Sequence, residues 1–199
     1  MPTVKRIVCL ANSRKLNGRC VAGIEIADGQ RLGWIRPVSA RQHQEVSPDE
    51  RQYADGTEPR VLDIMTVSLL KPVPRYYQQE NWLFDPARSW TKEGSMPVGD
   101  LERLVDPMEP LWITERANQD RVPRAQAMEL RSSVRLIHTD QVELSVRTTD
   151  GTFGPRRQLR GRFRHEGQDY CLSVTALSTR DGILRSQMDT TRFSRASSR

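Results

Sequence analysis

The strongest constraint on the fold of this chain is its series of short apolar runs that end in turns. No long amphipathic helix lies between these runs. Residues 4–10, 19–26 and 31–38 are three such runs near the start of the chain. A polar segment separates the first two, and Asp28-Gly29 between the second and third is typical of a hairpin turn. The pattern predicts a three-stranded meander.

Further strands are expected at residues 61–70 and, in the last third of the chain, at 133–139, 142–148, 157–165 and 170–176. The last two are predicted to form a hairpin around a Glu-Gly turn. A parallel α/β architecture is disfavoured, because such sheets need a long helix between successive strands.

The middle of the chain separates these two groups of strands. Residues 39–60 are polar without periodicity, which indicates a long loop or a short exposed helix. Short helices are expected at 99–105 and 125–131, and nearby prolines prevent longer ones.

Five of the twelve aromatic residues lie between residues 76 and 90. They form either an apolar plug between two barrels or a platform on which bases stack. We favour the plug and expect one exposed aromatic side chain among Tyr76, Trp82 and Trp90.

The predicted fold is therefore all-β with minor helix, built from two consecutive small Greek-key barrels. Each half has the size of an oligonucleotide-binding (OB) barrel, which has five strands. We place the first OB-like barrel at residues 1–95 and the second at 96–183. Residues 184–199, rich in Ser and Arg, are predicted to be a flexible tail.

The charge of the chain is +6 at pH 7, and its basic residues are segregated. Residues 1–24 and 155–165 each contain five Lys or Arg side chains and no acid. Basic segments of this kind attract polyanions. Arginine outnumbers lysine by 27 to 4. Its guanidinium makes bidentate hydrogen bonds to phosphate and stacks on bases. A GC-rich coding sequence would produce the same bias toward arginine.

Three cysteines and three histidines show no spacing typical of a disulfide framework or a zinc site. We expect Cys9 and Cys171 to be buried thiols, and we expect no metal and no cofactor. No apolar run is long enough to span a membrane, and the N-terminus lacks the pattern of a secretory signal. A cytoplasmic protein is therefore expected.

Three segments resemble the bacterial dual OB-containing domain family: IVCLANSRK at residues 7–15, GRCVAG at 18–23 and GWIRPVS at 33–39. Weaker similarity is present at residues 79–81 and 170–175. The resemblance implies two consecutive OB-like barrels and a nucleic-acid context, and it supplies no catalytic residue.

Basic and aromatic residues of the first half are candidates for nucleic-acid binding, because OB barrels combine a basic groove with aromatic faces that stack on bases. We expect two basic residues in the loop between the first two strands. Trp34 and Arg36 would share one face of the third strand. Alternatively, Trp34 belongs to the core and Arg36 lies at its solvent edge. The candidates are Arg14, Lys15, Arg19, Trp34, Arg36 and Trp82.

Alternating arginines near the end of the chain form a second candidate surface. On a strand they would line one face, where like charges repel unless an anion lies across them. Alternatively, this is a solvated face paired with acids such as Glu143 or Asp169. The candidates for phosphate binding are Arg156, Arg157, Arg160, Arg162 and Arg164.

Two common enzyme motifs are missing from the sequence. It contains no P-loop, and no lysine follows a carboxylate by two residues as in D/E-x-K nucleases. We therefore expect a non-enzymatic nucleic-acid-binding protein, with single-stranded DNA or RNA favoured, that serves as an accessory subunit of a larger nucleoprotein complex. The alternatives are an adaptor that docks an acidic protein partner and a small-ligand or nucleotide-binding domain.

Overall fold

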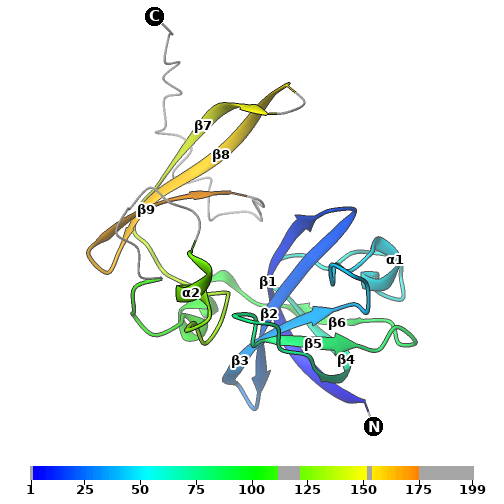
Figure 1. The fold of residues 1–199 in the computed structure, drawn as a ribbon. Helices are drawn as coiled ribbons and strands as arrows, with labels where there is room; N and C mark the ends of the chain where they lie inside the picture. The colour runs from blue at the N-terminus through cyan, green and yellow to red at the C-terminus, as the bar shows by residue number, and fades with distance from the viewer. Residues whose placement is uncertain (1, 112–121, 152–153, 175–199) are drawn as a thin grey trace, which may run out of the picture.

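The computed structural model describes residues 2–111, 122–151 and 154–174. Two β-sheets form the framework of this structure (Figure 1). A six-stranded sheet spans the first half of the chain, and a three-stranded sheet spans the last described part.

Five strands of the first sheet close into a barrel. They are β1 (Thr3–Lys15), β2 (Gly18–Ala27), β3 (Gln30–Val38), β4 (Asp63–Pro72) and β5 (Asn81–Phe84). The order is β1-β2-β3-β5-β4, and β4 also pairs with β1, which completes the circle. Only the β3–β5 pair is parallel within this ring. The ring is a five-stranded Greek-key barrel of the OB type, and β6 (Thr91–Ser95) adds to β4.

The β1–β2 hairpin is longer than the sequence predicts. Both strands continue to a two-residue turn at Leu16 and Asn17, so Arg14 and Lys15 lie at the end of a strand and not in a loop. The expected turn at Asp28-Gly29 is confirmed, with φ values of 51° and 74°.

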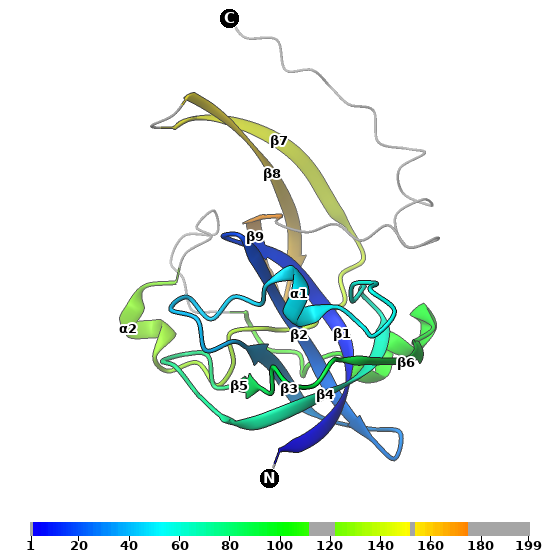
Figure 2. The same cartoon turned by 90° about the vertical axis from the view of Figure 1, so that its right-hand side faces the viewer.

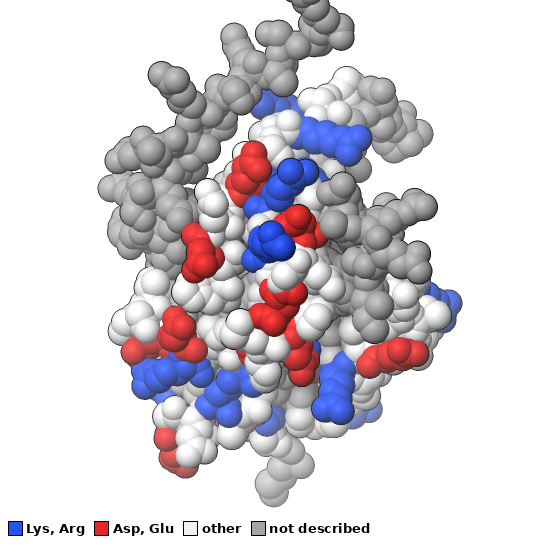
Figure 3. Space-filling model, turned by 90° about the vertical axis from the view of Figure 1, so that its left-hand side faces the viewer, with Lys and Arg blue, Asp and Glu red and all other residues white. Residues whose placement is uncertain are grey.

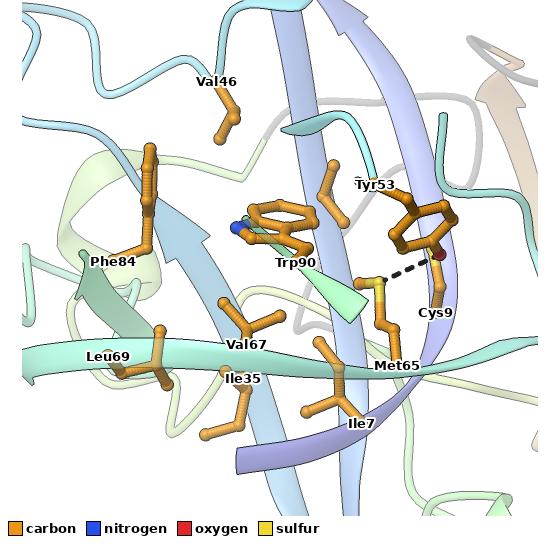
Figure 4. Close-up of a cluster of buried hydrophobic side chains, with 11 residues drawn as sticks. Ile7, Cys9, Ile35, Val46, Tyr53, Met65, Val67, Leu69, Phe84 and Trp90 are labelled. Carbon is orange, nitrogen blue, oxygen red and sulfur yellow. Dashed lines mark hydrogen bonds between the residues drawn. The ribbon is translucent and has the colours of Figure 1, made fainter. Parts of the chain in front are cut away.

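The barrel interior holds the first hydrophobic cluster (Figure 4). Phe84 and Trp90 meet edge to face there, with ring centroids 6.0 Å apart. The prediction that the aromatic segment plugs a space between two barrels is therefore wrong for these two rings, which fill the first barrel. The expectation of one exposed aromatic is confirmed by Tyr76, which is 50% exposed.

A second hydrophobic cluster covers the outer wall of the barrel. Ile64, Val8, Ile24 and Trp34 are neighbours across β4, β1, β2 and β3 in the strand register. Three residues from the middle of the chain, Met96, Leu104 and Leu136, pack on this row. The outer face of β2 and β3 is therefore covered by the chain itself.

Asp106 fixes this covering segment to the barrel. Its backbone amide donates to Leu136 O, and its carboxylate accepts from the Leu136 amide at 2.8 Å. The same carboxylate accepts from Trp34 Nε1 at 2.9 Å and pairs with Arg31. The strand predicted at 133–139 does not form. The amide and the carbonyl of Leu136 bond Asp106, and not a neighbouring strand.

The helices are short, as the prolines predict. Helix α1 (Pro48–Arg51) begins at Ser47, whose side chain accepts from the Glu50 amide while Glu50 accepts from the Ser47 amide. This reciprocal capping box stabilises an otherwise marginal single turn. A 3-10 helix, η1 (Val98–Leu104), and helix α2 (Arg124–Ala127) occupy the two other expected places.

The second sheet is an antiparallel meander of β7 (Val142–Gly151), β8 (Gly154–His165) and β9 (Gln168–Ser173). The expected Glu166-Gly167 turn joins β8 and β9, with positive φ at both residues. In Figures 1 and 2 the β7–β8 hairpin projects away from the first barrel. Three strands of the second unit are described, and the all-β class with minor helix is confirmed.

The boundaries at residues 95 and 183 stay predictions, and the predicted tail at 184–199 lies outside the described residues. None of the helices that the structure describes is long and apolar enough to cross a membrane.

Burial makes Cys9 an unreactive thiol. Its side chain is fully buried, and desolvation, reinforced by the charge of Asp63, raises its pKa to about 12. At pH 8 only about one molecule in ten thousand then carries the nucleophilic thiolate. We expect iodoacetamide to label Cys9 only after unfolding in urea, while the half-buried Cys20 and Cys171 react in the native protein. Mass spectrometry of the labelled peptides would measure this, and native labelling of Cys9 at the rate of Cys20 would contradict it.

Candidate functional site

A groove of about 1470 Å³ lies where the first barrel meets the second sheet. The β1–β2 hairpin and the β4–β5 loop form its barrel side. Its opposite side is the apolar face of β7–β9, where Gly161 and Phe163 lie, and the segment from 122 to 139 contributes further lining residues. OB barrels bind their ligands beside the β1–β2 and β4–β5 loops, so this is the position expected of a binding site.

The charge of the groove is one-sided. Its lining includes Arg75, Arg124 and Arg135, and no carboxylate occurs among the lining residues in the described part of the chain. Arg135 already bonds Glu109 at 2.6 Å, and this contact lowers the pKa of the Glu109 carboxyl. Arg75 and Arg124 therefore supply most of the positive charge that faces a ligand.

The tip of the β4–β5 loop presents two tyrosines to the groove. Arg75 and Gln78 exchange two backbone hydrogen bonds of 3.1 and 2.9 Å, so Tyr76 and Tyr77 are the central residues of a tight turn. Both side chains line the groove and are exposed. The Arg124 guanidinium lies over the Tyr76 ring, 5.0 Å from its centroid.

A buried ion pair holds the wall of the groove near β3. Arg36 pairs with Glu80 at 2.8 Å, and both side chains are more than 90% buried. Glu80 also accepts hydrogen bonds from Ser132 and Ser133, which line the groove. The pair thereby attaches the segment after α2 to the barrel.

The sequence-predicted residues of β3 lie elsewhere than expected. Arg36 is buried against Glu80 and faces neither the solvent edge nor the groove, because Glu80 and Ser133 cover it. Trp34 is half-buried in the outer cluster, with its indole N–H held by Asp106. This placement favours the core interpretation of Trp34 over base stacking.

Trp82 is half-buried against the barrel core, and the Lys5 ammonium lies 4.9 Å from its ring centroid. Lys5 in turn bonds Glu25 at 2.7 Å. Trp82 is not among the residues that line the groove. Of the basic residues of the hairpin, Arg14 and Arg19 are register partners in the β1–β2 pair, and the neighbouring Ser13 lines the groove.

The arginines of β8 do alternate as predicted, with Gly161 and Phe163 toward the groove and the arginines on the other face. Acidic residues share that outer face. Arg162 lies opposite Glu143 on β7, and Arg164 lies opposite Asp169 on β9. Figure 3, which views the molecule from the left-hand side of Figure 1, shows basic and acidic side chains interleaved on that side. The face is therefore less basic than the sequence alone indicates.

Individual arginines of the series differ in their surroundings. Arg160 donates to Ser173 Oγ at 2.9 Å and to the Cys171 carbonyl, whereas Arg162 is exposed. Arg157 lies opposite Thr148 and is exposed. Of Arg156 the structure describes only the backbone, which pairs with Thr149.

A second buried carboxylate of the barrel, that of Asp63, is not part of the groove. Asp63 is fully buried, which by itself raises its pKa, but hydrogen bonds from Lys92 and the Arg60 amide outweigh this effect and lower it. Tyr53 also donates to Asp63, at 3.2 Å. This arrangement holds β4 and β6 together and is best explained as structural.

Sequence reasoning singled out the aromatic segment but missed the two arginines from the middle of the chain. Arg75 and the tyrosines form a recognisable Arg-Tyr-Tyr signal directly after Pro74. Arg124 and Arg135 lie in a proline-rich stretch without periodicity, so only the tertiary structure brings them to the groove.

Comparison with known proteins gives one match. A family model described as a dual OB-containing domain matches residues 5–196. No curated protein and no solved structure matches the chain.

Proposed function

The chain belongs to the dual OB-containing domain family, and from this premise we propose that it binds single-stranded nucleic acid in the groove between its two β units. The charge of the groove is the observation that carries the proposal: its lining includes three arginines and, within the described chain, no carboxylate. Such a groove attracts phosphates, and its tyrosines offer flat faces to bases.

The covered outer wall of the barrel supports this location. Strands β2 and β3 of an OB barrel commonly present their face to an oligonucleotide. Here Leu104 and Leu136 already occupy that face. A strand of nucleic acid would therefore lie beside the β1–β2 and β4–β5 loops.

We propose binding without catalysis, as an accessory subunit of a larger nucleoprotein complex. The side chains that line the groove offer guanidinium groups, tyrosine rings, amides, hydroxyls and the imidazole of His43, and groups of these kinds hold a strand and position it. A protein partner is the second candidate. The pairing of Arg162 with Glu143 and of Arg164 with Asp169 in the strand register favours it, because a face of mixed charge suits a complementary protein surface better than a phosphate chain.

The salt dependence of binding tests the groove. If the protein neutralises about six phosphates, the log–log slope of affinity against salt should be near −4 for a single strand. Changing Arg75 and Arg124 together to Gln should flatten this slope by about 1.4, since each lost phosphate contact removes about 0.7. Fluorescence anisotropy with a labelled oligonucleotide would measure the slope.

The matched control changes two exposed arginines outside the groove. Arg88 and Arg103 pair locally with Asp85 and Asp100. Changing both to Gln removes the same charge and should leave the slope near the wild-type value. Equal slopes for both double variants would contradict the groove as the phosphate-binding surface. Absence of binding to any single strand at low salt would contradict the proposed function itself.

A further inference from the structure

The turn at the tip of the β4–β5 loop has an unusual residue at its strained position. Tyr76 has a φ of 53°, in the left-handed region. Two-residue turns between paired strands favour Gly, Asn or Asp at such positions, because a large side chain with Cβ is strained there. A tyrosine at this position therefore lowers the free energy of unfolding relative to glycine or asparagine.

The Tyr76 side chain gains little from burial in return. It is 50% exposed and lines the groove. Its backbone is nevertheless fixed, since Gln79 Nε2 donates to the Tyr76 carbonyl and the Arg75–Gln78 pair closes the turn. The result is an aromatic ring held at a defined place with much of its surface open.

Arg124 gives the ring a charged neighbour. The guanidinium lies 5.0 Å from the centroid of Tyr76, and it comes from helix α2, which is distant in sequence. An aromatic face beside a guanidinium is the pairing that proteins use to hold an unpaired base and its phosphate together.

We infer that Tyr76 is a base-stacking residue, so that the groove selects unpaired nucleobases and discriminates against duplexes. The inference rests on the proposed function, and it adds the ligand group and the residue that recognises it. In a duplex the faces of the bases are covered by their neighbours, so a single strand alone can offer one to Tyr76.

The test compares two single-stranded probes of about 20 nucleotides, which is long enough for two OB units. One is labelled oligo-dT, and the other has the same phosphates but abasic sites in its central part. We expect Tyr76→Asn to weaken binding to oligo-dT by about 5- to 150-fold, the range of one lost stacking contact. Binding to the abasic probe and the slope against salt should not change.

Stability separates a recognition role from a structural one. Because asparagine tolerates the left-handed conformation, Tyr76→Asn should have an unchanged or higher Tm. Tyr76→Phe should keep the affinity for oligo-dT, since the ring is retained. Leu32→Ala, which truncates an exposed apolar residue of β3 outside the groove, is the control and should leave both affinities unchanged.

The possible results distinguish a failure of the stacking role of Tyr76 from a failure of the proposed function. Wild-type affinity of Tyr76→Asn for oligo-dT would overturn the inference and leave the proposed function standing. Equal weakening for both probes, or a Tm lowered by several degrees, would also overturn it, because the lost affinity would not come from the bases. If the wild-type protein bound neither probe, the proposed function would fail first.

Discussion

Replacing Trp90 with alanine is expected to lower the free energy of unfolding by about 3–5 kcal/mol. The indole is fully buried and is the largest side chain in the barrel interior, where it contacts Phe84 edge to face. Its removal leaves a cavity that the closed ring of strands cannot collapse to fill. Urea denaturation followed by circular dichroism would measure the loss.

Trp90→Phe is the informative companion variant. Among the residues that the structure describes, Trp90 Nε1 finds no hydrogen-bond acceptor, so phenylalanine removes volume and an unsatisfied donor together. Its cost should therefore be clearly smaller than that of alanine. A loss below about 1 kcal/mol for the alanine variant would contradict the position of Trp90 in the core.

Changing Glu80 to Gln should be about as damaging, with an expected loss of about 3–5 kcal/mol. Side-chain exposures are only 8% for Arg36 and 3% for Glu80. Without the carboxylate, the guanidinium stays buried with no opposite charge beside it, which is the costly state of a broken buried pair. Chemical denaturation at neutral pH would measure the effect.

The pair between Arg103 and Asp100 offers a control with the same N···O distance, 2.8 Å. Both of its side chains are exposed, so Asp100→Asn should cost less than about 1 kcal/mol. Replacing both Arg36 and Glu80 by apolar residues of similar size should recover much of the stability. Equal effects of Glu80→Gln and Asp100→Asn would contradict the burial of the Arg36–Glu80 pair.

The strands with strong apolar alternation were predictable, and the weaker ones were not. The meander of β1 to β3 and the β8–β9 hairpin follow from period two and from turns such as Asp28-Gly29. Strand β5 has only four residues, and β6 is polar and mostly exposed, so neither shows a pattern. They form because β4 offers them backbone partners, which is information that lies far away in the sequence.

The position of Arg36 shows why a strand pattern does not fix a binding residue. Alternation correctly predicts that it shares a face with Trp34, but not what covers that face. Glu80 neutralises the guanidinium from 44 positions away, and Ser133 caps it from still farther along the chain. The groove is likewise assembled from segments distant in sequence, so Arg124 and Arg135 were visible only as isolated residues.

The covering of the outer barrel wall by Leu104 and Leu136 has a consequence for how sequences of this kind can diverge. The barrel takes part of its apolar shielding from beyond residue 95, and Asp106 joins the two sides of that seam. A larger side chain at Leu136 would have to be accommodated by a change among the other side chains of this cluster. Substitutions on the two sides of this seam are therefore expected to occur together, because each side shapes the surface on which the other packs.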